Sequence, residues 1–242
     1  MKYTLIYGLL GAALTYWGWS LGWWGLLLVW FALSFFALAA GHAGLGPRVF
    51  CKRADGKIPF WSKALHLPFL IYAGIIRFVS VTFSNGNAAD QVSERLLIGR
   101  RLRTMEVPGG IVNYVDLTAE MEDPQEIRER QGYVCFPILD GSVPSKEDLK
   151  KAIMNLADGV TYVHCAQGYG RTALFALALL AAQGQIRSVT QGLDCLKAVR
   201  PGIRLNSAQR HFIEAYIEEN GEQFTPADRA KPAASRPSSP VG

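Results

Sequence analysis

Charged side chains are missing from the start of the sequence: no Lys, Arg, Asp or Glu lies between Tyr3 and Pro47. The whole chain has 242 residues, of which 50% are hydrophobic and 19% are charged, so this segment holds much of the apolar excess. A chain of this composition is too apolar for a simple soluble domain. The remaining residues have about the length of one ordinary globular domain.

Cysteine is also scarce. Cys51, Cys135, Cys165 and Cys195 have neither metal-site nor disulfide-scaffold spacing, and we expect Cys135 and Cys195 in the core. The net charge of +5 comes from dispersed basic residues, and no nucleic-acid-binding motif is present. We therefore expect no nucleic-acid partner, and a membrane surface explains the basic balance more simply.

The uncharged segment predicts a transmembrane helical hairpin within residues 1–47. The apolar run 4–40 would reach about 55 Å as one helix at ~1.5 Å per residue, whereas the hydrocarbon core is ~30 Å thick. Two shorter helices joined at Gly18–Gly22 fit better, with an aromatic belt of tryptophans at that turn. A cleavable signal peptide is the competing interpretation, but the tryptophans and the second apolar run argue against it.

Basic residues flank the hairpin on one side of the membrane. Lys2 precedes it, and four basic residues follow it: Arg48, Lys52, Arg53 and Lys57. By the positive-inside rule both ends are cytoplasmic, which predicts a multi-pass membrane protein with a cytoplasmic catalytic domain. The compact size and the bare two-helix anchor favour a bacterial inner membrane.

Residues 48–87 are predicted to be a basic linker followed by an interfacial apolar helix. The apolar stretch 65–83 contains Pro68 near its start and Arg77 at its centre, which favours a helix lying at the interface. A full span stays open as the alternative, because nineteen residues just suffice to cross the hydrocarbon core. In that case Arg77 would lie near mid-membrane, at a cost in free energy.

The composition of residues 88–222 predicts an α/β domain with a central, mostly parallel sheet flanked by helices. Apolar strand patterns at 96–99, 111–117, 133–139 and 160–165 alternate with helical patterns, and Pro137 indicates an edge strand or a bulge. Further helices are expected at 145–157, 174–183, 188–199 and 206–219. The tail 223–242 is rich in Pro, Ser and Ala and is predicted to be disordered.

The sequence VTYVHCAQGYGRT, residues 160–172, predicts a strand, a tight loop and a helix start. Loop N–H groups over a helix N-terminus form an anion site, and Arg171 adds a planar fork for phosphate oxygens. The positive potential of the helix N-terminus and of Arg171 also favours the thiolate form of Cys165. The predicted phosphate-binding residues are Ala166, Gln167, Gly168, Tyr169, Gly170 and Arg171.

His164-Cys165, five intervening residues and Arg171-Thr172 resemble the signature of the cysteine-dependent protein tyrosine and dual-specificity phosphatase superfamily. RPGIRLNSAQ, residues 200–209, is similar to the segment that follows the phosphate loop in many dual-specificity phosphatases. The resemblance implies a phosphocysteine mechanism and a dual-specificity phosphatase-like fold. A reducing compartment is expected, because the nucleophile must stay a thiol. No metal and no cofactor are needed.

Such a reaction also needs an acid that protonates the leaving oxygen. Asp140 directly follows the strand pattern 133–139 and precedes Gly141, which places it at the sheet edge expected for Cys165. Asp116 also ends a strand and is the alternative. A plain Asp-Gly turn is the other interpretation of this pair.

Two further residues are assigned catalytic roles. His164 is expected to hydrogen-bond the loop backbone, and in the resembled family the corresponding histidine supports the low pKa of the cysteine. Thr172 is expected to bond the thiolate or to assist breakdown of the phosphocysteine, as the family's Ser or Thr does, or to be an ordinary first-turn residue. Asn206 and Gln209 either orient the hydrolytic water or cap a helix.

The predicted function is a membrane-anchored phosphoric monoester hydrolase acting on phosphotyrosine or phosphoserine/threonine proteins. A lipid phosphate phosphatase acting on a phosphatidylglycerophosphate-like head group by the same mechanism is the alternative, because an anchor concentrates the site at lipids and membrane proteins alike. A non-catalytic phosphate-binding adaptor is the third possibility. It would be marked by loss of the cysteine, the arginine or the acid, all of which are present.

Overall fold

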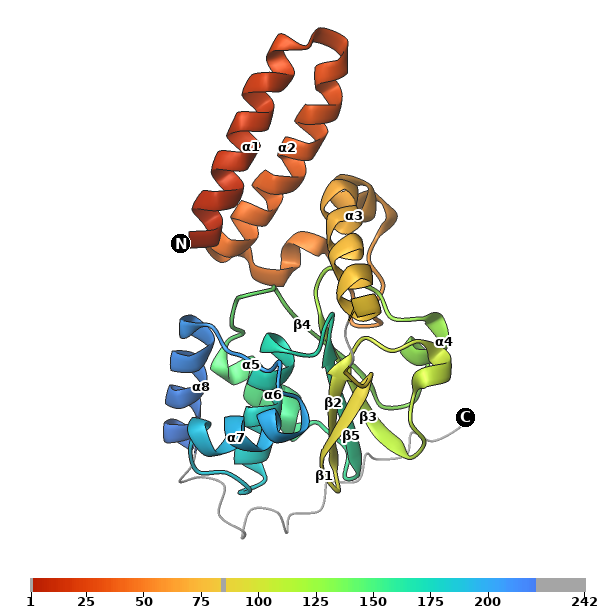
Figure 1. The fold of residues 1–242 in the computed structure, drawn as a ribbon, viewed down its shortest axis with the longest axis vertical. Coiled ribbons are helices and arrows are strands. Elements are labelled where there is room, and N and C mark those ends of the chain that lie inside the picture. The colour runs from red at the N-terminus through yellow and green to blue at the C-terminus, as the bar shows by residue number, and fades with distance from the viewer. Residues whose placement is uncertain (1, 84–85, 221–242) are drawn as a thin grey trace, which may run out of the picture.

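The structure, a computed structural model, describes residues 2–83 and 86–220 and contains a helical hairpin, a long single helix and an α/β part (Figure 1). The predicted disordered tail 223–242 lies outside the described residues. We call residues 2–83 the N-terminal part and residues 86–220 the α/β part. These names are kept below.

A five-stranded sheet forms the centre of the α/β part, in the order β1-β2-β5-β3-β4. The strands are β1 Ala89–Ser93, β2 Leu96–Arg100, β3 Ile111–Thr118, β4 Tyr133–Ile138 and β5 Val160–Cys165. All neighbours are parallel except β1 and β2, which confirms the mostly parallel sheet. Pro137 lies in β4, an edge strand, and the pairing with β3 shifts register between Cys135 and Ile138, so both the edge and the bulge apply.

Helices cover the two faces of the sheet unequally. Four helices pack on one face, namely α5 Lys146–Met154, α6 Gly170–Ala182, α7 Val189–Val199 and α8 Ser207–Asn220. The other face is covered by the short α4, Gln125–Arg128, and by loop residues such as Leu102. Helix α6 is buried from Arg171 to Ala181, which explains why it is apolar on every side.

Three local predictions were inexact. Helix α6 starts at Gly170 rather than near Leu174, because the Ala173 N–H already bonds the Tyr169 carbonyl. The polar strand β1 was missed, since its sequence lacks the apolar alternation of a buried strand. Cys195 is exposed instead of belonging to the core, because it lies on the outward face of α7 beside the buried Leu196.

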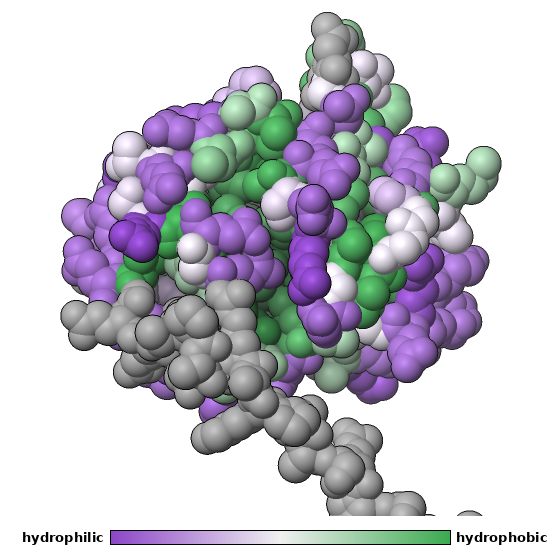
Figure 2. Space-filling view, turned by 90° about the horizontal axis from the view of Figure 1, so that it is seen from below, coloured by the Kyte–Doolittle hydropathy of each residue, from purple (hydrophilic) through white to green (hydrophobic). Residues whose placement is uncertain are grey.

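The hairpin consists of α1 Lys2–Ser20 and α2 Gly25–Ala40, and its open end faces the α/β part (Figure 1). A Cβ on Gly25 would lie 1.8 Å from the Gly18 carbonyl oxygen, so glycine permits the close turn. Judged by length and composition among the described residues, two stretches could cross a membrane: Gly22–Phe50 and Phe60–Phe83. The opposite end of the molecule is rich in polar side chains (Figure 2).

Helix α3 spans Phe60–Phe83 and so begins before the apolar stretch 65–83, with Pro68 in its interior. Proline cannot bond the carbonyl four residues earlier, and that Ala64 oxygen instead accepts the Trp30 indole N–H at 3.0 Å. Near one end of α3, Lys63 pairs with Glu122 at 2.8 Å. Near the other end, the Gln167 amide donates to the Ser80 hydroxyl at 2.9 Å. Helix α3 therefore lies along the α/β part.

The segment between α2 and α3 is packed into the α/β part. It contains two short helical turns, Gly41–Leu45 and Gly46–Phe50. Leu38 and Phe50 share a buried apolar cluster with Ala119 and Leu139 of the α/β part. The hairpin base, α3 and the sheet edge thus form one continuous packing unit.

Candidate active site

The predicted phosphate loop joins the carboxyl end of β5 to the start of α6. Gly168 has a φ of +78°, and a Cβ there would lie 2.4 Å from the Gly99 carbonyl group. Only glycine combines this backbone conformation with so close an approach to β2. The loop residues Cys165, Ala166, Gln167, Tyr169, Gly170 and Arg171 line a cavity of about 280 Å³.

Cys165 is buried at the base of the loop, and its Sγ accepts the Gly168 N–H at 3.2 Å. Burial by itself raises the pKa of the thiol. The Arg171 charge, the Thr172 hydroxyl and the backbone N–H groups of Tyr169 and Gly168 outweigh it and lower the pKa of Cys165 below its ordinary value. The site therefore favours the thiolate.

Arg171 is held by a buried acid that the sequence analysis missed. Its two terminal nitrogens bond the Glu120 carboxylate at 2.8 and 2.7 Å, and Nη1 also donates to the Ile138 carbonyl at 3.1 Å. Burial raises the pKa of Glu120, but the Arg171 charge and its hydrogen bonds lower that pKa by more. The net pKa is below the ordinary value, so the carboxylate stays ionised. Glu120 lies 51 residues before its partner, and no local pattern marks it.

Asp140 lies at the rim of the same cavity, on the loop after β4. Its carboxylate is 80% exposed and its Oδ1 is 3.2 Å from Arg171 Nε. The following residue, Gly141, has a φ of +73° and accepts a bond from the Asn206 amide at 2.8 Å. Asn206 and Gln209 also cap each other's backbone N–H groups, so both cap the helix and brace this loop.

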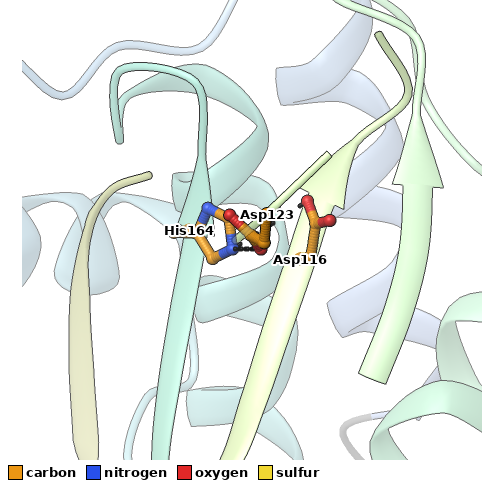
Figure 3. Close-up of side chains that lie close together, drawn as sticks. All are labelled: Asp116, Asp123 and His164. Carbon is orange, nitrogen blue, oxygen red and sulfur yellow. Dashed lines mark hydrogen bonds and ion pairs between the residues drawn. The ribbon is translucent and has the colours of Figure 1, made fainter. Parts of the chain in front are cut away.

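Asp116, the alternative acid, belongs to a buried charge network behind the loop (Figure 3). Its carboxylate is inaccessible to solvent and bonds Lys52 Nζ at 2.6 Å. Asp123, a second residue missed from the sequence, bonds His164 Nε2 through Oδ2 at 3.0 Å. Its other oxygen lies 3.2 Å from Arg101 Nε. Asp116 does not line the cavity and is not placed to protonate a leaving group there.

His164 faces an oxygen acceptor at each ring nitrogen. Nε2 faces Asp123, and Nδ1 lies 3.3 Å from the Cys165 carbonyl oxygen. Burial lowers the pKa of His164, yet Asp123 and then Asp116 raise it more, and the net pKa is above the ordinary value. Two acceptors and a raised pKa fit the imidazolium form, with both nitrogens donating.

The network also has the donor types of a metal site. In the described part of the chain, ligand atoms of Asp116, Asp123 and His164 lie within 4.8 Å of one another. The Lys52 ammonium and the Arg101 guanidinium already supply positive charge to the two carboxylates. These cations fit a network neutralised by protein groups rather than a metal centre.

Arg200, directly after α7, holds the backbone of the predicted phosphate loop in place. The buried Arg200 donates to the Gly168 carbonyl and the Gln167 carbonyl, both at 2.9 Å, and pairs with Asp90 at 2.7 Å. Its guanidinium also lies over the Tyr169 ring, 5.2 Å from the centroid. Arg200 opens the RPGIRLNSAQ stretch, so this part of the resemblance corresponds to a structural clamp on the loop.

The N-terminal part supplies the opposite wall of the cavity. The lining residues from α1, the hairpin base and α3 are mainly aromatic or apolar, and include Tyr3, Tyr7, His42, Phe50, Phe69, Tyr72, Ala73, Ile76 and Arg77. On the loop after β4 that carries Asp140, Ser142 Oγ lies 3.3 Å from His42 Nδ1. The cavity is thus shared between the hairpin base, α3 and the phosphate loop.

Comparison with known proteins gives a sequence match and several fold matches. The chain is 35% identical over 89 residues to protein 197R of Invertebrate iridescent virus 6, which is named as a tyrosine phosphatase. The match covers 32% of this chain and 34% of the viral protein, so the chain spans about a third of that relative. No protein-family model matches.

Solved structures match a little more than half of the chain. A mouse protein described as a dual-specificity phosphatase, in complex with zinc tungstate, has a TM-score of 0.50 at 18% identity, over 59% of this chain and 99% of the mouse chain. PTPMT1 in complex with PI(5)P has a TM-score of 0.49 at 13% identity, over 57% of this chain and 100% of that chain. The chain therefore shares its fold with the mouse protein and is similar in sequence to the viral protein over 89 residues.

Proposed function

We propose that this chain hydrolyses phosphomonoesters through a phosphocysteine intermediate on Cys165. The observation that carries the proposal is the buried thiol of lowered pKa, which lines the cavity beside Arg171 and the loop N–H groups. A thiolate is the form that attacks phosphorus, and fixed positive groups stabilise the charge that develops on the phosphoryl oxygens.

The proposed reaction has two steps. First, the sulfur of Cys165 bonds to phosphorus while the ester P–O bond breaks, and Asp140 donates its proton to the leaving oxygen. Then water attacks phosphorus, the P–S bond breaks, and Asp140 takes the proton from that water. The hydroxyl of Thr172 stabilises the departing thiolate, while His164 holds the loop through the Cys165 carbonyl.

The phosphate is cradled by loop N–H groups from Ala166 to Gly170 and by the Arg171 fork, which Glu120 keeps in position. In this structure Asp140 lies against Arg171 Nε, at the mouth of the cavity. A bound phosphate would compete with that carboxylate for the guanidinium. Asp140 is then free to meet the leaving oxygen.

Phosphotyrosine and phosphoserine/threonine proteins are the first proposed substrate class. The names of the viral tyrosine phosphatase and of the mouse dual-specificity phosphatase support this class. The aromatic cavity wall, with Tyr3, Phe69 and Tyr72, is also suited to a phenyl ring.

A phospholipid carrying a phosphomonoester is the second candidate. The observation in its favour is the cavity wall, which continues into helices with exposed apolar side chains such as Ile71, Ile75 and Phe78. Arg77 adds a cation to that wall, and its buried Nε has no hydrogen-bond partner among the residues that the structure describes. A second anionic group on a lipid head group would satisfy it.

The N-terminal part is proposed to hold the site at a membrane. The hairpin would cross or enter the bilayer, and α3 would lie at the interface with its apolar face toward lipid. Contacts of Lys63 and Ser80 with the α/β part support this placement of α3, because a helix that spanned the bilayer could not keep both. The catalytic part would then lie on the cytoplasmic side, with the basic residues after the hairpin.

The full chain in detergent micelles should be assayed with phosphotyrosyl and phosphoseryl peptides and with a phospholipid phosphomonoester. We expect release of phosphate from the peptides. Hydrolysis of the lipid alone would select the second candidate. No hydrolysis of any of these, nor of a generic aryl phosphate, would contradict the proposed function.

Replacing Asp140 with alanine should lower kcat by about 10²-fold for esters with a poor leaving group. The loss should shrink below about tenfold for an aryl phosphate whose phenol is strongly acidic, since that leaving group needs little protonation. Plots of kcat against leaving-group pKa for the parent and the variant check this. Asp158→Ala, an exposed acid in a turn, is the control, and an equal loss for all leaving groups would reject Asp140 as the acid.

Replacing Arg77 with methionine tests the lipid candidate. If Arg77 binds a second anionic group, the KM for the phospholipid should rise about tenfold more than the KM for an aryl phosphate, since a charged hydrogen bond is lost only with the lipid. Steady-state kinetics in mixed micelles measure both values. Equal changes in the two KM values would remove Arg77 from lipid recognition.

A further inference from the structure

Lys52 carries a fully buried ammonium group, although it belongs to the segment that connects the hairpin to α3. Its side chain has no solvent-accessible surface. Nζ donates to Asp116 Oδ2 at 2.6 Å, to the Thr118 carbonyl at 2.7 Å and to the Met121 carbonyl at 2.6 Å. A lysine is rarely buried unless it is paired, and these contacts compensate the buried charge of the Lys52 ammonium.

The contacts of Lys52 lead directly to the residue before the nucleophile. Asp116 Oδ1 lies 3.9 Å from His164 Nε2, and the other side of the imidazole faces the Cys165 carbonyl. Asp116 and His164 are also paired in the sheet, on β3 and β5 (Figure 3). A change of charge at Asp116 therefore acts on a fixed neighbour of the phosphate loop.

The groups of this network balance in charge when His164 is an imidazolium and Cys165 a thiolate. Lys52, His164 and the partly exposed Arg101 then supply three positive charges, and Asp116, Asp123 and Cys165 supply three negative charges. Outside this set, Arg171 pairs with Glu120 at 2.7 Å and lies 3.2 Å from Asp140. Two neutral groups of β4 face the network, the Tyr133 hydroxyl, which donates to Asp116 at 2.7 Å, and the Cys135 thiol.

We propose that Lys52 is a positioning residue of the phosphatase site, whose charge offsets Asp116 and so allows Cys165 to exist as a thiolate above the network. The inference rests on the phosphocysteine chemistry proposed above. It makes the connecting segment a part of the active site rather than a tether. A chain shortened to begin at residue 88 would keep Asp116 and lose its cation.

The effect of each charge has a definite sign. Burial raises the pKa of Asp116, but Lys52 and then His164 lower it to about 2, so the carboxylate is ionised at every working pH. Without Lys52, that ionised group adds an unbalanced negative charge beneath the loop. Negative charge disfavours the thiolate, and the pKa of Cys165 should rise.

The test compares four forms of the full chain in detergent: the parent, Lys52→Met, Asp116→Asn and the double variant. The readout is the rate of iodoacetamide alkylation of Cys165 against pH, followed by mass spectrometry of its peptide. The inflection should rise by about one pH unit in Lys52→Met, a tenfold change in thiolate fraction below it. It should fall in Asp116→Asn and return near the parent value in the double variant.

Lys57→Met, an exposed lysine of the same segment, is the matched control and should leave the inflection unchanged. An unchanged inflection in folded Lys52→Met, or shifts that fail to cancel in the double variant, would overturn the inference. If Lys52→Met does not fold, Asp116→Asn decides alone, because a rise or no change there contradicts the charge balance. Alkylation needs no turnover, so this result is independent of whether Cys165→Ser abolishes phosphatase activity.

Discussion

Replacing Cys165 with serine is expected to lower the turnover of a generic aryl phosphate by at least about 10⁴-fold. The loop lowers the pKa of the Cys165 thiol, but a serine hydroxyl starts from a far higher pKa and stays protonated beside the same groups. The serine side chain is close in size, so binding of phosphate should persist. Steady-state assays of the full chain in detergent measure the loss.

Cys195→Ser is the matched control for that prediction, because Cys195 is exposed on α7, away from the loop. We expect it to keep the parent rate. Retention of more than a tenth of the parent rate by Cys165→Ser, with the fold intact by circular dichroism, would remove Cys165 from the role of nucleophile.

Replacing Arg171 with lysine is expected to lower kcat/KM by about 10³-fold, although the charge is conserved. Glu120 grips the two terminal nitrogens, which fixes the plane of the guanidinium toward the cavity. A single ammonium cannot keep the two bonds to Glu120 and also bind two phosphate oxygens. The inhibition constant of inorganic phosphate should rise in parallel, because the same fork binds the product.

Arg204→Lys serves as the control, since Arg204 is exposed on the segment after α7. It should change kcat/KM by less than twofold. An Arg171→Lys variant within about threefold of the parent would show that charge alone is needed at this position, and the planar fork would lose its assigned role.

The loop between β5 and α6 was predictable from sequence because its parts are contiguous. Seven residues from Cys165 to Arg171 contain the proposed nucleophile, the glycine that needs a positive φ and the guanidinium. Alternating strand and helix patterns around them predicted the parallel sheet and placed the loop at its carboxyl edge. Local sequence was sufficient to predict the loop because all of its candidate site residues follow one another in the chain.

The supporting charges were not predictable in the same way. Glu120, Asp123 and Lys52 meet their partners across 51, 41 and 64 residues, respectively. Each is an ordinary charged residue in its local sequence, and the fold alone decides that it becomes buried. Lys52 was interpreted as one of several basic residues flanking a hairpin, whereas its ammonium lies inside the α/β part.

The placement of α3 illustrates a second limit. The pattern of residues 65–83 fits both a membrane span and an interfacial helix, because hydropathy is the same in either case. The two interpretations differ in which polar side chains have protein partners. Lys63 and Ser80 both have partners in the α/β part, and this information exists only in three dimensions.

The measurement that tests the account most directly is rapid acid quenching of the full chain during turnover of an aryl phosphate, followed by peptide mass spectrometry. The proposed mechanism predicts one phosphoryl group on the peptide that carries Cys165, at the sulfur, before the steady state is reached. The Cys165→Ser variant should remain unlabelled. A phosphoryl group on His164 or any other side chain, or turnover with a burst but no labelled Cys165, would contradict the phosphocysteine mechanism.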